Sequence, residues 1–359
     1  MIGRSVQAVV LAAGKSKRLN TDQSKLLEPI CGKAMVLHTT TLLELMHIPA
    51  TLIVGYQKEQ VEQTVKQYHA TNNTFTFVTQ TEQLGTGHAL KCSQPTWTSN
   101  HILVMNGDAP LLTQQLLEEL IENHLQNNAA MSFMVSHNFD PSVTGYGFVV
   151  TEDNIVKIVE ARHFQHEQRE SFPINGGIYI FRRSFLESVI DTLPRNPISG
   201  EYYLTTLAEM ASINGLPVIT VETPFDHVRG VNTLRELWVA EQIKRSEIID
   251  HWMKNGVRFF APQNVIIDET VRIGRCSTIG CGAHLLGKTV IGENVSVGPF
   301  CILHDTVISD NCILESHIVV NNSLLSANRI IKPFVHIENE QIVQTYTPNT
   351  TIKPDISTL

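Results

Sequence analysis

The sequence predicts an α/β protein in two parts, a domain with a mainly parallel sheet followed by a parallel β-helix. Up to about residue 227, apolar runs rich in β-formers alternate with helical segments, which is typical of an α/β domain. From Val265 onward, apolar and small residues recur every six positions, which is the period of a parallel β-helix. A chain of 359 residues is long enough for two separate cores.

Strands and helices are expected to alternate through the first part. The strand candidates are residues 7–12, 51–54, 75–79, 102–105, 131–135, 148–151, 155–160, 178–181 and 218–221. Several are continuous apolar runs, as in strands buried on both faces. The helix candidates between them include residues 36–45, 59–68 and 116–125. In a sheet of this kind, ligands bind beyond the carboxyl ends of the strands.

A connecting helix is expected next. Thr233 and Glu236 have the spacing of a capping box, in which the two residues satisfy each other's backbone donors. We expect this helix to reach Asn255 and to end at Gly256.

The second part repeats with a period of six residues. One phase comprises Val265, Val271, Ser277, Ala283, Thr289, Val295, Cys301, Val307, Ile313, Val319, Leu325, Ile331 and Ile337. A second phase comprises Ile267, Ile273, Ile279, Leu285, Ile291, Val297 and Leu303, and then turns polar at Ser309, Glu315 and Asn321. We interpret the change as degradation of the repeat. A β-sandwich is the alternative, but strands of period two would not hold a six-residue phase for so long.

Composition and charge restrict the class of ligand. The net charge of −8 argues against a general nucleic-acid surface. No apolar run approaches the roughly 18 residues of a membrane span, and the start does not look like a signal peptide, so we expect a cytoplasmic protein. Residues 4–33 carry six cationic side chains against two acidic ones. This cluster suits a small, highly anionic ligand, although a solvated loop is the alternative.

The stretch VVLAAGKSKRLNTDQSK (residues 9–25) follows the first expected strand. Its Gly14-Lys15-Ser16 is like the end of a Walker A loop, but Val9 stands where that loop needs a glycine, so a P-loop is not expected. The backbone N–H groups near Gly14 can still approach phosphates closely, and Arg18 and Lys25 add positive charge. Nucleotidyl transfer depends mostly on such positioning and charge stabilisation.

Two further loops carry candidate site residues. Asp108 closes the run ILVMNGD, so its carboxylate follows a buried strand, and Asn232 ends Gly230-Val231-Asn232. Together they offer oxygen ligands for Mg²⁺, although an Asp in this place is also common as a turn or helix-cap residue. The run QTEQLGTGH (residues 80–88) follows another strand. Its amides can read a base edge, and its glycines permit close packing of a flat ring.

Taken together, these motifs resemble those of the bacterial N-acetylglucosamine-1-phosphate uridyltransferases, which in their full form also acetylate glucosamine-1-phosphate. The resemblance covers roughly residues 5–340. It rests on LAAGxxxR, Ser24-Lys25, QxEQLGTGHA, GD, TGYG, IVE, ING, GEYYLT and GVN, in the family's order. It implies a Rossmann-like nucleotidyltransferase domain followed by a short left-handed parallel β-helix, usually trimeric. The parts would be residues 1–227, a connecting helix at 228–256, the β-helix at 257–340 and a tail at 341–359.

The resemblance also implies roles for single residues. Arg18 and Lys25 would stabilise the phosphates, and Asp108 and Asn232 would bind Mg²⁺. The nucleotide would contact Leu11, Ala12, Ala13, Gly14, Gln80, Gln83, Gly85 and Thr86. The sugar would contact Asn106, Gly107, Gly147, Glu160 and Asn175. The implied reaction converts UTP and N-acetylglucosamine-1-phosphate to UDP-N-acetylglucosamine and pyrophosphate, and needs no general base because the nucleophile is already ionised.

The sequence also departs from the family's pattern. Ser16-Lys17 replaces Gly-Thr, Asn106 stands where Tyr precedes GD, Phe148 where Arg follows GYG, and Thr206 where Asp follows GEYYLT. A nucleotidyltransferase for another sugar and a non-catalytic sugar-nucleotide-binding regulator are therefore alternatives.

The acetyl-transfer motifs of the longer enzymes do not occur in this sequence. GHxxYxGD, GAGT and NYDG are all missing, so we expect no acetyltransferase activity, and we read the shortened β-helix as a trimerisation element. A hexapeptide acyltransferase using His284, His304, His317 or His336 as a base is a further alternative that these missing motifs disfavour.

Overall fold

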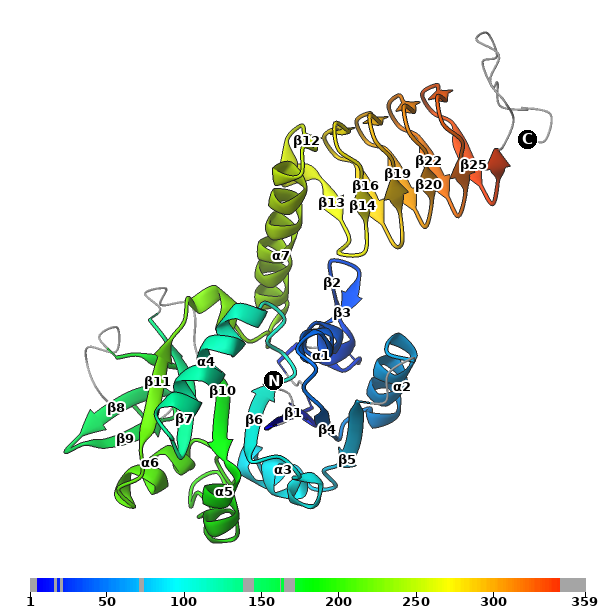
Figure 1. Ribbon diagram of the computed structural model, residues 1–359. Helices are drawn as coiled ribbons and strands as arrows, with labels where there is room; N and C mark the ends of the chain where they lie inside the picture. The colour runs from blue at the N-terminus through cyan, green and yellow to red at the C-terminus, as the bar shows by residue number, and fades with distance from the viewer. Residues whose placement is uncertain are drawn as a thin grey trace. The chain divides into compact units, whose positions relative to one another are not determined.

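The computed structural model describes residues 5–15, 18–19, 22–70, 74–137, 145–161, 163–164 and 172–342 (Figure 1). The chain divides into two compact units. The first comprises residues 1–28 and 34–240, and the second comprises residues 29–33 and 241–359. The short segment 29–33 therefore groups with the C-terminal unit, which its place in the sequence does not suggest.

The first unit is built on a nine-stranded sheet with the main order β11-β7-β10-β6-β1-β4-β5. Its strands are β1 (Val6–Ala12), β4 (Ala50–Val54), β5 (Phe75–Thr79), β6 (His101–Asn106), β7 (Met131–Ser136), β8 (Phe148–Glu152), β9 (Ile155–Val159), β10 (Ile174–Arg182) and β11 (Val218–Glu222). Strand β1 pairs in parallel with both β4 and β6, whereas β10 runs antiparallel to β6 and β7. The nine expected strands are confirmed, and the sheet is Rossmann-like.

Strand β10 begins four residues earlier than expected. A break in register between Asn175 and Tyr179 marks a bulge, and Gly177 there has φ +74°. Because two adjacent glycines look like a break in a strand pattern, the sequence placed the start after them.

Seven helices occur among the described residues: α1 (Met35–Leu45), α2 (Lys58–Tyr68), α3 (Thr86–Cys92), α4 (Gln114–Gln126), α5 (Arg183–Val189), α6 (Thr206–Ile213) and α7 (Leu234–Lys254). The three expected in the first part correspond to α1, α2 and α4, and the connecting helix to α7. The sequence missed α3, α5 and α6 because seven or eight residues are too few for a helical period to stand out. No helix in the described ranges is both long and apolar enough to cross a membrane.

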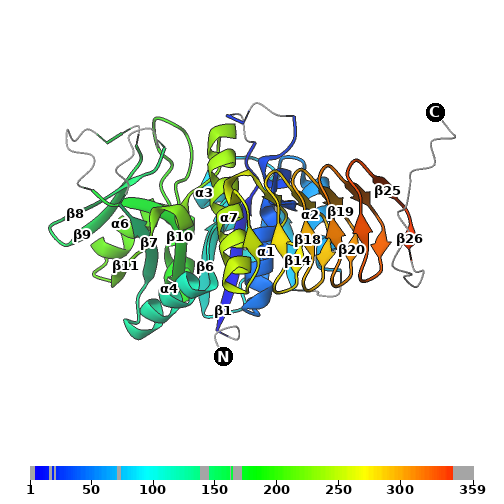
Figure 2. The same ribbon diagram turned by 90° about the horizontal axis from the view of Figure 1, so that it is seen from above.

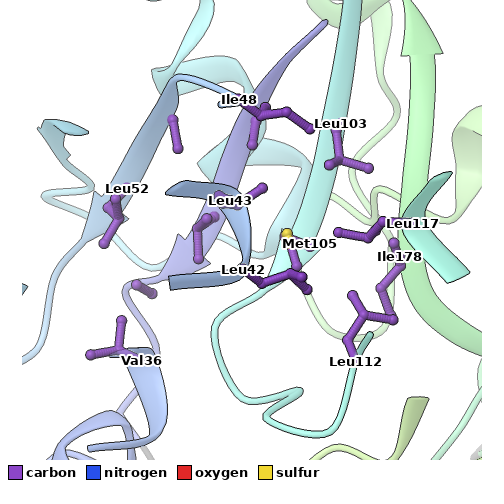
Figure 3. Close-up of a cluster of buried hydrophobic side chains, with 14 of the residues drawn as sticks. Val36, Leu42, Leu43, Ile48, Leu52, Leu103, Met105, Leu112, Leu117 and Ile178 are labelled. Atoms are coloured by element: carbon purple, nitrogen blue, oxygen red, sulfur yellow. The ribbon is translucent and has the colours of Figure 1, made fainter. Parts of the chain in front are cut away.

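The sheet of the first unit separates two hydrophobic cores. Adjacent β1 residues such as Val9 and Val10 belong to different cores, as the two-residue period of a strand requires. Figure 3 shows part of one of these cores, in which Leu43 lies between Leu52 and Met105. Burial on both faces explains why the central strands read as continuous apolar runs.

The second unit contains three five-stranded parallel sheets of short strands, the arrangement of a left-handed parallel β-helix (Figure 2). One sheet comprises β12 (Arg258–Phe259), β15 (Thr278–Ile279), β18 (Ser296–Val297), β21 (Ile313–Leu314) and β24 (Ile330–Ile331). The next comprises β13 (Ile266–Ile267), β16 (His284–Leu286), β19 (Ile302–His304), β22 (Val319–Asn321) and β25 (His336–Glu338). The third comprises β14 (Arg272–Ile273), β17 (Val290–Ile291), β20 (Val307–Ile308), β23 (Leu324–Leu325) and β26 (Gln341–Ile342).

The six-residue phase does not continue as the sequence suggested. Pairing shifts from 18 residues per coil, as in His284 with Ile302, to 17, as in Val290 with Val307. One corner of each later coil is a residue shorter, so the inward positions move by one. Ile308, Leu314 and Val320 are buried, whereas Val307 and Ile313 face outward. The interpretation of a degraded repeat was therefore wrong, because the buried row continues in a shifted register.

A hairpin of β2 (Pro29–Ile30) and β3 (Lys33–Ala34) follows the 3₁₀ helix η2 (Lys25–Leu27). Among the described residues, the other 3₁₀ helices are η3 (Gln94–Thr96), η5 (Ile190–Thr192), η6 (Phe225–Val228) and η7 (Pro262–Asn264).

Candidate active site

The carboxyl ends of β1 and β6 define one edge of the first unit's sheet. Leu11 lies opposite Asn106 in the parallel register, and the Gly107 N–H donates to the Leu11 carbonyl at 3.0 Å. The loops after these strands carry Gly14 and Asp108. The expected site residues of both loops are thus neighbours because their strands are neighbours.

Lys25, Asp108 and Asn232 form a charged cluster at this edge. The Lys25 ammonium forms an ion pair with Asp108 Oδ2 and donates to Asn232 Oδ1 at 2.9 Å. The Lys25 and Asp108 side chains are only 15% and 14% exposed. Residues separated by 83 and 207 positions are therefore gathered in a partly desolvated place, where their charges act more strongly than in water.

Backbone contacts hold the acid and the amide in place. The Val231 N–H donates to the Asp108 carbonyl at 3.1 Å. The Asn232 N–H donates to Glu236 Oε2 at 2.8 Å, and the Glu236 N–H donates to the Thr233 hydroxyl at 3.2 Å. The capping box expected from the sequence is present in this form. It fixes the start of α7 and, with it, Asn232.

Tyr146 is a neighbour of this cluster that sequence reasoning did not single out. Its hydroxyl accepts from the Gly230 N–H at 2.8 Å, beside Asp108 and Asn232. Burial raises the pKa of Tyr146 to about 12, and the Asp108 carboxylate adds to the rise. A neutral phenol therefore supports the backbone before Asn232. The motif TGYG, read only as a family marker, was the signal available.

The loop after β1 leaves space around Gly14. A Cβ on Gly14 would meet no atom within 4 Å, so a ligand can approach the backbone there. The Ala13 carbonyl accepts from the Tyr56 N–H at 3.2 Å, and the Gln83 amide lies close to Gly55 and thus to the same loop. Arg18 is exposed, and its guanidinium lies next to Gly145 on the loop that carries Tyr146. Ser16 and Lys17 lie outside the described residues.

Gln57 is a second residue that the sequence gave no reason to select. Its side-chain oxygen accepts from the Ser24 N–H at 2.6 Å, and its amide nitrogen donates to the Asp22 carbonyl at 2.8 Å. These bonds fix the segment that leads into Lys25. No motif marks Gln57, because only the fold brings it there.

The loop with QTEQLGTGH is held in shape by its own side chains. The buried Gln80 amide donates to the Gly85 carbonyl at 3.2 Å and contacts His88 Nδ1 at 3.1 Å. The Thr86 hydroxyl accepts from the Leu204 N–H at 3.1 Å. Gln80 and Thr86 therefore have structural partners, and their contact with a base stays a prediction.

The expected sugar residues lie around β10. The Asn175 N–H donates to the Gly147 carbonyl at 2.8 Å, and the Asn175 amide donates to the Tyr179 hydroxyl at 2.6 Å. Glu160 Oε1 accepts from the Thr205 hydroxyl at 3.3 Å. Burial raises the pKa of Tyr179 above its usual range, so the phenol stays neutral beside Glu160. Gly147, Glu160 and Asn175 are thus close neighbours, whereas Asn106 lies against Gly177.

Comparison with known proteins identifies the family. Residues 8–202 match the model of the MobA-like NTP transferase domain, and residues 261–355 match that of the GMPPB C-terminal domain. The bifunctional protein GlmU of Caldanaerobacter subterraneus is 31% identical over 341 residues, which cover 94% of this chain and 73% of that protein. The chain belongs to the GlmU family.

Other GlmU proteins match over a smaller part of their length. That of Exiguobacterium sibiricum is 33% identical over 298 residues, and that of a Geobacillus species is 36% identical over 298 residues. Each match covers 81% of this chain but only 65% and 63% of the relatives. The chain thus spans less than two thirds of the length of these two relatives.

A solved structure shares the fold of about two thirds of the chain. A crystal structure named for a glucose-1-phosphate thymidylyltransferase of Bacillus anthracis aligns with a TM-score of 0.54 at 18% identity. It covers 66% of this chain and 95% of the other. At this identity the likeness concerns the fold alone. The family model that matches residues 8–202 places the chain among the nucleotidyltransferases.

The cluster in this GlmU-family chain is chemically suited to a divalent cation. Asp108 and Asn232 offer one carboxylate and one amide oxygen, the hard ligands that Mg²⁺ takes when water and phosphate oxygens supply the rest. Both oxygens are already turned toward a positive charge, the Lys25 ammonium. Within the described ranges, no group of three or more His, Cys, Asp or Glu residues suggests a metal site of another kind.

Proposed function

We propose that this protein is a uridyltransferase that makes UDP-N-acetylglucosamine and pyrophosphate from UTP and N-acetylglucosamine-1-phosphate. The observation that carries the proposal is the contact of Lys25 with both Asp108 and Asn232 at the carboxyl ends of β1 and β6. Parallel α/β sheets bind their ligands at this edge. Membership of the GlmU family supports the nucleotidyl transfer, and the motifs support the choice of substrates.

The chemistry requires positioning and charge rather than an acid–base pair. An ionised phosphate oxygen of the sugar-1-phosphate attacks the α-phosphorus of UTP, and the bond from that phosphorus to the bridging oxygen breaks. Pyrophosphate leaves with the electron pair of this bond, so no proton needs to move. Lys25 and Arg18 offset the negative charge of the phosphates, while the backbone around Gly14 admits them closely.

We propose Mg²⁺ as the cofactor, held by Asp108 and Asn232. When bound, the ion supplies positive charge that neutralises the triphosphate and orients its oxygens. The Lys25 ammonium would then move from these two oxygens toward the phosphates, which its flexible side chain permits. The capping box keeps Asn232 in place during this exchange.

The choice of sugar depends on the residues around Gly147. Phe148 stacks on Phe164 with ring centroids 4.2 Å apart, where the family usually has Arg. With Phe148 in place of Arg, the positive charge of the family's residue is missing near the proposed sugar residue Gly147. A different sugar-1-phosphate is therefore the second candidate. A non-catalytic regulator fits less well, because Lys25, Asp108 and Asn232 are all retained.

One assay separates these candidates. Purified protein is incubated with Mg²⁺, UTP and a panel of sugar-1-phosphates, and pyrophosphate release is measured. We expect release with N-acetylglucosamine-1-phosphate. Pyrophosphate release only with another sugar-1-phosphate would identify that compound as the substrate instead. If no sugar-1-phosphate gives pyrophosphate, the non-catalytic regulator becomes the better candidate. Acetyl-CoA consumption on glucosamine-1-phosphate, measured in parallel, tests the predicted lack of acetyl transfer.

A further inference from the structure

Two residues of the proposed site stand at the start of segments that pass into the second unit. Lys25 begins η2, and the β2–β3 hairpin follows two residues after this helix ends. Asn232 precedes α7, which runs from Leu234 to Lys254. The division between the units falls after Glu28 on the first path and after Ala240 on the second. Two separate segments of the chain therefore lead from site residues into the second unit.

The hairpin turn is fitted closely to the first coil of the β-helix. Cys31 and Gly32 both have positive φ, +47° and +76°, as a two-residue hairpin turn requires. The Cys31 carbonyl accepts from the Glu269 N–H at 3.0 Å. A Cβ on Gly32 would overlap the carboxyl group of Asp268. Because Asp268 is itself held by the Gly287 N–H at 2.7 Å, it cannot easily give way.

The same coil is tied to both segments by charge. Lys33, only 6% exposed, lies 3.5 Å from Glu269, and Lys244 on α7 lies 3.6 Å from the same carboxylate. Cys31 Sγ lies 3.8 Å from the Glu241 carbonyl at the beginning of the second unit's part of α7. Burial raises the pKa of the Cys31 thiol to about 12, so this contact carries no charge. Hairpin, coil and α7 thus form one cluster within the second unit.

A short chain of backbone bonds connects the hairpin to Lys25. The Met35 N–H donates to the Glu28 carbonyl at 3.0 Å and closes the base of the hairpin. The Glu28 N–H donates to the Lys25 carbonyl at 3.2 Å. The segment between Lys25 and the first strand of the hairpin is therefore short, and its backbone is hydrogen-bonded.

We propose that Gly32 and Lys33 are positioning residues for nucleotidyl transfer. By fixing the hairpin on the first coil, they hold η2 so that the Lys25 ammonium meets Asp108 and Asn232. The part of the inference that concerns the reaction rests on the proposed function. A displacement of about 1 Å at such a site lowers turnover by an order of magnitude or more.

The test uses the full chain and a matched pair of glycines. Gly32→Ala introduces a Cβ at φ +76° against Asp268, whereas Gly215→Ala does so at φ +66° with nothing within 4 Å. Both changes strain the backbone, but only the first disturbs the hairpin. Hydrogen exchange of ligand-free protein is measured over residues 22–28 and 230–237, together with kcat. We expect Gly32→Ala to speed exchange in both segments and to lower kcat about tenfold or more.

A second variant keeps the test possible if Gly32→Ala does not fold. Lys33→Ala removes the ion pair with Glu269 and should give the same changes to a smaller degree, and Lys33→Arg should restore them. Unchanged exchange over both segments, or faster exchange with an unaltered kcat, would overturn the inference, and so would an equal effect of Gly215→Ala. If the wild-type protein transfers no nucleotide, the proposed function fails by itself. The exchange comparison then still decides whether the hairpin holds these segments.

Discussion

Under the proposed function, Lys25, Asp108 and Asn232 would offset the charge of the phosphates without a general base. Each follows a motif that could be recognised in the sequence, and the parallel register of β1 and β6 brings the first two loops together. The contact itself was not predictable, because a Lys between two proposed metal ligands depends on side-chain geometry. Gln57 and Tyr146 were missed for the same reason.

A substitution of Asp108 tests its proposed role as a metal ligand. Asp108→Asn keeps the shape but removes the charge that faces Lys25. We expect turnover to fall at least a hundredfold while the affinity for UTP measured without metal changes less than about threefold, since one charged contact to the reacting centre is worth about 3 kcal/mol or more. Asp191→Asn, on an exposed pair with Lys91, is the control. An equal loss of affinity and turnover would contradict the metal assignment.

His124 predicts how stability depends on pH. It is fully buried between His101 Nδ1 at 3.1 Å and the Ser132 hydroxyl at 2.9 Å. Burial lowers its pKa to about 3, with His101 and Arg182 adding to the shift. Because the folded pKa lies below the unfolded value of about 6.5, the unfolded state takes up a proton first as pH falls.

Stability should therefore decrease as the pH falls below about 6.5. Between pH 7 and pH 5 we expect His124 to contribute a loss of about 2 kcal/mol in the free energy of unfolding. Urea unfolding at both pH values measures it, and His124→Gln should reduce the difference. The exposed His251→Gln should not. A pH dependence identical in both variants would show that His124 is not responsible.

At the scale of elements, the β-helix shows what a periodic pattern can and cannot predict. The six-residue repeat predicted the architecture, because every coil buries residues at fixed positions. It did not predict the corner that is one residue shorter in each later coil, first at Asp305 and Thr306, because apolar side chains stand at both the old and the new phase. The short helices α3, α5 and α6 were missed since they depend on tertiary packing rather than on a long periodic pattern.

Adjacent residues of β21 test the shifted register. Leu314 is 1% exposed and belongs to the core, whereas Ile313 is 42% exposed, although the unshifted phase would put Ile313 in the row of buried residues. We expect Leu314→Ala to cost about 2–5 kcal/mol and Ile313→Ala about 1 kcal/mol or less. Denaturant unfolding followed by circular dichroism measures both. If Ile313→Ala lowers the free energy of unfolding more than Leu314→Ala does, the buried row follows the unshifted phase.

At the scale of the whole molecule, we propose the homotrimer that the resemblance implies. Val290, Val307 and Leu324 form an outward row on neighbouring strands of one β-helix sheet, and each is more than a third exposed in the single chain. Sedimentation equilibrium should give three times the chain mass of 40.1 kDa. Leu324→Lys should shift the mass toward one chain, because it places a charge in this row. A monomeric wild-type protein would contradict the proposal.

We propose that the charges beyond β1 and β6 receive the phosphates of a uridine nucleotide. The most direct measurement is a crystal structure of the full chain with UDP-N-acetylglucosamine and Mg²⁺ bound. We predict the diphosphate within hydrogen-bond reach of the loop after β1, with the metal between Asp108 and Asn232. A nucleotide bound away from this loop, with Lys25 still against Asp108, would contradict the account.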